Sequence, residues 1–108
     1  MSLDLTFKVD GKMKTFSKDA IYFKDNIRAV KHTIVQQKFF NSENQNEEMY
    51  EETQQSFCEM MADIFDGQFS AEQFKSGMTL ENVSKAEDIF TLALGGKLDS
   101  KEKESEKK

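Results

Sequence analysis

The sequence contains no proline and no tryptophan, and it has only one cysteine and one histidine. A single cysteine cannot form a disulfide within the chain, so Cys58 is expected to be a small buried core residue. No apolar run approaches the roughly 20 residues of a membrane-spanning helix. The N-terminus also lacks a basic region followed by an apolar stretch. These absences lead us to expect a soluble intracellular protein with no membrane partner.

Groups of side chains that catalyse reactions or bind metals are also missing from the sequence. His32 has no cysteine or second histidine at metal-ligand spacing, and no acidic residue three or four positions away. There is no phosphate-binding glycine loop, no G-x-S-x-G and no H-E-x-x-H, and Asp66-Gly67 lacks the spaced oxygen ligands of a calcium loop. The sequence therefore predicts a protein that is not an enzyme and needs no cofactor or metal. His32 is then a structural residue, solvated or partly buried.

Large apolar side chains are plentiful, since the 108 residues include 10 phenylalanines and 6 methionines. This length fits one domain, predicted over residues 1–96. Residues 97–108 are rich in lysine and glutamate, with Leu98 as their one large apolar side chain, and are expected to be disordered. The net charge of −5 disfavours binding to nucleic acid and makes a protein the expected partner.

An N-terminal β-hairpin is predicted from alternating residues. Apolar and polar side chains alternate over Leu3–Val9, Asp10-Gly11 is a strong turn signal, and residues 12–16 supply the return strand. A two-residue turn places Leu5 opposite Phe16 and Val9 opposite Lys12, which we favour. A three-residue bulged turn would place Val9 opposite Met13 instead.

The spacing changes to that of a helix after residue 23. Phe23, Ile27, Val30 and Ile34 share one helical stripe of a first helix, which is expected to run from about Lys24 to residues 37–40. Residues 20–23 either form a third short strand or lead directly into this helix. Residues 41–46 read as a polar loop. A second helix follows, with apolar residues from Met49 to Phe65 on one side.

The stretch IFDGQFSAEQFKSG, residues 64–77, then predicts a helix end and a new start. Gly67 is expected to end the second helix, and Ser70 and Gln73 fit a capping box that begins a short helix ending at Gly77.

A final helix is predicted from near Thr79, carrying Leu80 and Leu94, to Gly95-Gly96. The predicted fold is α+β, a hairpin packed on three to four helices. Its structural motif residues are Asp10, Gly11, Phe65, Gly67, Phe69, Ser70, Gln73, Phe74 and Gly77.

Two groups of residues are candidates for contacting a partner. One is the acidic group Glu47, Glu48, Glu51 and Glu52, either a solvated helix face or a docking surface for a basic partner. The other consists of the adjacent pairs Phe39-Phe40 and Met60-Met61. One member of each pair is expected to pack inward and the other to face outward. The methionines are either core residues or an adaptable surface for apolar segments of another chain.

Taken in order, these pieces resemble the tail assembly chaperones of long-tailed phages and prophages of Gram-positive bacteria. The resemblance runs from about Leu3 to Leu94. Its most specific part is the arrangement I-F-x-x-Q-F-[ST]-x-x-x-F-x-x-G. The matching residues are Ile64, Phe65, Gln68, Phe69, Ser70, Phe74 and Gly77.

The resemblance implies a role without catalysis. Such a chaperone binds the tape measure protein, a long helical chain that sets tail length, keeps it soluble and helps recruit tail tube subunits. It acts in the cytoplasm of the bacterial host, self-associates in our leading hypothesis, and is not expected in the mature virion. In many members a ribosomal frameshift yields a longer form, for which Lys107-Lys108 is a compatible ending. The alternatives are a structural tail or connector subunit, or an acidic inhibitor or antitoxin.

Overall fold

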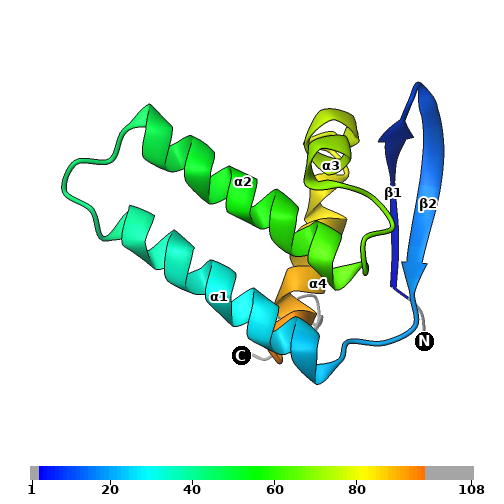
Figure 1. Ribbon diagram of the computed structural model, residues 1–108, viewed down its shortest axis with the longest axis horizontal. Helices are drawn as coiled ribbons and strands as arrows, with labels where there is room; N and C mark the ends of the chain where they lie inside the picture. The colour runs from blue at the N-terminus through cyan, green and yellow to red at the C-terminus, as the bar shows by residue number, and fades with distance from the viewer. Residues whose placement is uncertain (1–2, 97–108) are drawn as a thin grey trace, which may run out of the picture.

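The computed structural model describes residues 3–96, so the tail expected over residues 97–108 lies outside the described residues. Two strands, β1 (Leu3–Val9) and β2 (Lys12–Lys18), precede four helices. The helices are α1 (Phe23–Phe40), α2 (Glu47–Ile64), α3 (Ala71–Gly77) and α4 (Val83–Ala93). In Figure 1, α1 and α2 lie side by side and run in opposite directions, and the hairpin stands at the end away from their connecting loop. The fold is α+β, as predicted.

The hairpin has the two-residue turn and the register favoured from the sequence. Asp10 and Gly11 both have positive φ, 55° and 82°, and Leu5 pairs with Phe16. β1 buries every second side chain, from Leu3 to Val9, because its inner face packs on the helices. Within residues 3–96 no third strand forms, since residues 19–22 lead directly into α1.

The aromatic stretch between α2 and α4 packs against the inner face of β1. The Phe7 ring meets the rings of Phe69 and Phe74 edge to face, with centroids 5.0 and 5.5 Å apart. Phe65, Phe69 and Phe74 are all buried. Such pairs add about 0.5–1.5 kcal/mol each to the gain from burial. The three phenylalanines therefore hold α3 and the hairpin to the core.

Local geometry explains how α2 stops and α3 starts. Asp66 and Gly67 adopt left-handed φ values of 58° and 76°, which end α2. Ser70 Oγ accepts from the Gln73 backbone N–H at 3.0 Å, and Gln73 Oε1 accepts from the Ser70 N–H at 2.9 Å. The predicted capping box is therefore present.

One sequence expectation about a helix end needs correction. α4 begins at Val83 rather than near Thr79, because residues 79–82 form a turn in which Asn82 N–H donates to Thr79 O. Leu80, expected on the helix, is consequently 92% exposed. Gly77 ends α3, as predicted, although its φ is not left-handed. A Cβ there would collide with the backbone oxygen of Lys8, so Gly77 allows α3 to approach β1 closely.

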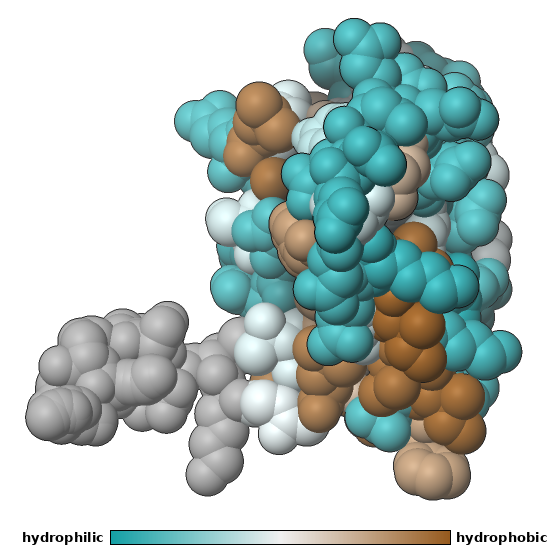
Figure 2. Space-filling view, turned by 90° about the vertical axis from the view of Figure 1, so that its left-hand side faces the viewer, coloured by the Kyte–Doolittle hydropathy of each residue, from teal (hydrophilic) through white to brown (hydrophobic). Residues whose placement is uncertain are grey.

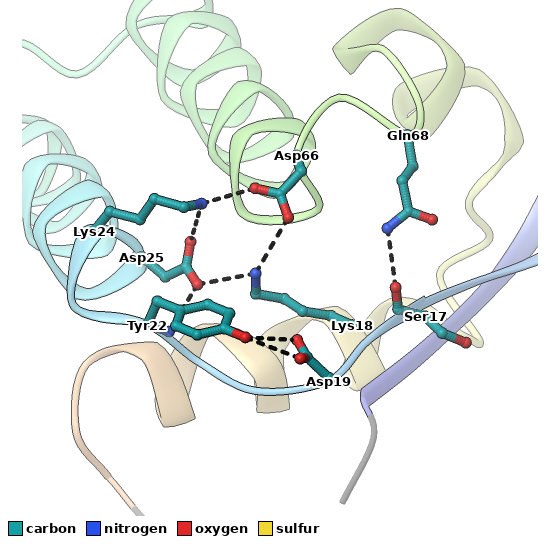
Figure 3. A network of polar contacts seen from close by, with 8 residues as sticks. All are labelled: Ser17, Lys18, Asp19, Tyr22, Lys24, Asp25, Asp66 and Gln68. Carbon is teal, nitrogen blue, oxygen red and sulfur yellow. Dashed lines mark hydrogen bonds and ion pairs between the residues drawn. The ribbon is translucent and has the colours of Figure 1, made fainter.

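A polar network joins the end of β2 to the start of α1 and the end of α2 (Figure 3). Lys18 is 4% exposed and its Nζ lies 3.1 Å from Asp25 Oδ2. Lys24 Nζ bridges Asp25 Oδ1 at 3.2 Å and Asp66 Oδ1 at 2.7 Å. Lys24 thereby lowers the pKa of Asp66. These contacts fix the direction in which α1 leaves the hairpin.

Candidate binding surfaces

The apolar stripe predicted on α1 lies on the exposed side of the helix and not in the core. Phe23 is 79% exposed, Ile27 47%, Val30 44% and Ile34 52%. The buried residues of α1 are Asp25, Ala29 and His32. At 100° per residue these lie on the opposite side of the helix, where α2 and α4 pack. We call the four exposed residues the α1 seam.

The α1 seam is concentrated on one part of the molecule. In Figure 2 hydrophobic surface gathers in the lower half, the level at which Figure 1 places α1, while hydrophilic surface covers most of the upper half. Scattered exposed apolar residues are normal on soluble proteins, but a contiguous row on one helix marks an interaction surface.

The sequence-predicted pairs of adjacent apolar residues differ in exposure. Phe40 is 64% exposed and Phe39 is half-buried against Tyr50, with ring centroids 6.1 Å apart. Met60 and Met61 are both completely buried, so the expectation that one of them faces outward is wrong. Two adjacent residues of α2 can both be buried because α1 and α3 both pack against this helix. In this conformation the two methionines have no surface to offer a partner.

All four candidate glutamates are exposed, and the structure brings two of them, Glu47 and Glu51, close to Phe39. Glu47 and Glu51 line a hollow of about 440 Å³ together with Phe39 and Tyr50. Glu48 and Glu52 line a neighbouring hollow of about 630 Å³ that also includes Tyr50 and Lys75. Tyr50 is 53% exposed and borders both hollows, and the sequence reasoning missed it. The position of Tyr50 among glutamates could have indicated that its side chain lies on the outward side of the helix.

His32 is fully buried rather than solvated, and it faces a cavity of about 420 Å³ between α1, α2 and α4. Its Nδ1 lies 2.9 Å from Ser56 Oγ, and its ring contacts those of Phe57 and Phe90. Burial lowers the pKa of His32, and repulsion from Arg28 lowers it further. The neutral imidazole is therefore a packing group. Cys58 is buried as predicted, and burial raises the pKa of its thiol.

Residues 3–96 show no cluster of three or more His, Cys, Asp or Glu side chains arranged to hold a metal ion. None of the four helices is both long and apolar enough to cross a membrane.

The fold and its surfaces define a small α+β protein whose most distinctive exposed feature is an apolar helix face. Compared with protein-family models, the chain matches the family described as phage tail chaperone protein over residues 1–108. The chain belongs to this family. Comparisons with curated proteins and with solved structures gave no match. Membership supports a chaperone role in phage tail assembly and, in general terms, binding to tail proteins.

Proposed function

We propose that this phage tail chaperone binds the tape measure protein, keeps it soluble and helps recruit tail tube subunits to it. It acts without catalysis in the cytoplasm of the bacterial host and leaves before the virion is complete. Self-association, which would let many copies cover one long client, is part of the proposal.

The observation that carries this proposal is the α1 seam. A client that aggregates through apolar helices requires apolar surface on its chaperone, and α1 offers such surface outside the core. The net charge of −5 opposes aggregation of the chaperone itself and of its complexes. Both properties suit a binding protein that holds another chain in solution.

Co-expression tests the proposal directly. The tape measure protein of the phage or prophage that encodes this chain is divided into overlapping fragments, and each is expressed with and without the chaperone. We expect at least one insoluble fragment to become soluble and to co-purify with the chaperone. If no fragment gains solubility or co-purifies, the tape measure proposal is wrong.

The alternative function is that of a structural tail or connector subunit, which would stay in the virion. Mass spectrometry of purified virions separates the two roles. A chaperone should be absent or far below one copy per tube ring, whereas a structural subunit should be present at a fixed ratio to the tube protein.

A further inference from the structure

The α1 seam has the spacing of a coiled-coil interface. Phe23, Ile27, Val30 and Ile34 are separated by four, three and four residues, which is the a/d pattern of a heptad repeat. The seam is narrow, as expected for residues that contact a single partner helix. It also lies opposite the buried residues of α1, so a second helix can lie along it without disturbing the core.

One edge of the seam is basic along the length of α1. Lys24, Lys31 and Lys38 follow one another at intervals of seven residues, at the heptad position next to the seam. All three are exposed. Lys24 is already paired with Asp66 and Asp25, whereas Lys31 and Lys38 form no ion pair with any residue between 3 and 96. Residues at the corresponding positions on the opposite edge, Asn26, Thr33 and Phe40, are uncharged.

A second copy of the chain is a poor occupant of this seam. Two antiparallel α1 helices would place lysine against lysine, and two parallel ones would pair each lysine with an uncharged residue. The α2 helix of a second copy could also lie along the seam. Its outward side would attract the lysines, but it carries glutamates and glutamines instead of an apolar row. Residues 97–108 have only Leu98 as a large apolar residue, so these residues cannot fill a row of apolar positions.

We propose that the α1 seam binds one helix of a different protein, with apolar residues in heptad spacing and acidic residues beside them that face Lys31 and Lys38. That this helix belongs to the tape measure protein rests on the proposed function. The apolar residues supply most of the affinity, and the lysines select the partner and its register.

Two synthetic peptides of about three heptads test the seam independently of any tape measure fragment. Both have leucine at a and d. One has glutamate at e and g, and the other has lysine there, so that like charges keep each peptide from pairing with itself. We expect the wild-type protein to bind the glutamate peptide at least tenfold more tightly. The protein's net charge of −5 would by itself produce the opposite preference.

Three double variants and one single variant identify the surface that binds the peptide. Val30→Ser with Ile34→Ser should weaken binding of the glutamate peptide at least tenfold, while Leu80→Ser, at an exposed apolar residue outside the seam, should leave it unchanged. Lys31→Glu with Lys38→Glu should reverse the preference toward the lysine peptide. Lys12→Glu with Lys14→Glu, the same charge change on exposed residues of β2, should not. Circular dichroism checks that each variant is folded.

The outcomes separate this inference from the proposed function. If the glutamate peptide binds through the seam but no tape measure fragment binds, the seam is correct and the client is wrong. If a fragment binds with undiminished affinity to the Val30/Ile34 variant and the peptides show no preference, the client is correct and the seam inference is overturned. Sedimentation gives a third outcome: if the wild type self-associates and the Val30/Ile34 variant does not, the seam binds a second copy and the inference is wrong.

Discussion

Lys18 and Lys24 contact the same two carboxylates, Asp25 and Asp66, in different surroundings. The Lys18 side chain is 2% exposed and that of Lys24 is 60% exposed. Removing one partner of a buried ion pair leaves the other charge without compensation, which costs about 3–5 kcal/mol, whereas exposed pairs contribute less than about 1 kcal/mol. We expect Lys18→Met to lower the free energy of unfolding by about 3 kcal/mol, because Lys24 still contacts Asp25.

Lys24→Met is the matched control, since it removes an ammonium from the same network at its exposed side. It should cost less than about 1 kcal/mol in urea unfolding followed by circular dichroism. Equal losses in the two variants would show that burial of Lys18 does not set the strength of the network.

His32 predicts a pH dependence of stability. Its lowered pKa means that the unfolded chain binds the proton more tightly than the folded protein does. Stability should therefore fall as the pH drops through the unfolded value of about 6.5, and the loss should level off below the folded pKa. Glu87 lines the same cavity from α4.

Unfolding measured at about pH 7.5 and 5.5 tests this expectation. His32→Gln should be less stable at both values, because it loses ring contacts, yet the difference between the two pH values should become much smaller. An unchanged difference would assign the pH dependence to other groups.

At the scale of elements, α1 shows what periodicity can and cannot predict. The spacing from Phe23 to Ile34 correctly indicated a helix with an apolar stripe, because the stripe follows from geometry alone. It did not reveal that the core uses the opposite side, where Ala29 and His32 pack. Whether the apolar stripe or the opposite side of α1 is buried depends on the tertiary arrangement, which periodicity does not describe. The same limit hid Lys18 and Asp25, whose charges resemble those of a solvated surface.

Signals that act within a few residues were more reliable. The Asp10-Gly11 turn and the Ser70–Gln73 capping box both formed as predicted, since each depends on local backbone geometry. The end of α3 was also located correctly. However, the need for glycine at position 77 comes from β1, which is far away in the sequence, so no local rule could give that reason.

Packing of α3 on β1 predicts unequal costs for two glycine substitutions. In Gly77→Ala the new methyl group collides with the Lys8 backbone and approaches the Phe7 ring, so α3 must move away from β1. In Gly67→Ala the methyl group has open space, and only the left-handed φ of 76° is unfavourable, by about 1–2 kcal/mol. We expect Gly77→Ala to lower the free energy of unfolding by more than about 2 kcal/mol, measured by urea unfolding, and to cost more than Gly67→Ala. Similar costs would mean that the close approach is easily relaxed.

At the scale of the whole molecule, charge is unevenly distributed over the two long helices. The outward side of α2 carries Glu47, Glu48, Glu51 and Glu52, while one edge of α1 carries lysines. Replacing all four glutamates by glutamine removes most of the net charge of −5. Stability should change little, because relief of repulsion at i,i+4 spacing is offset by the loss of favourable carboxylates at the helix N-terminus. Solubility should fall, since a net charge near zero promotes association.

Affinity for the client decides what this acidic surface does. If the α1 seam makes the contact, the glutamine variant should bind a soluble tape measure fragment within about twofold of the wild type, measured by calorimetry at fixed ionic strength. Its lower solubility would then show that the glutamates serve to keep the chaperone and its complexes dispersed. A loss of tenfold or more, with the fold intact, would instead identify α2 as a docking surface for a basic segment of the client, and the hollows around Tyr50 would become the place to look for it.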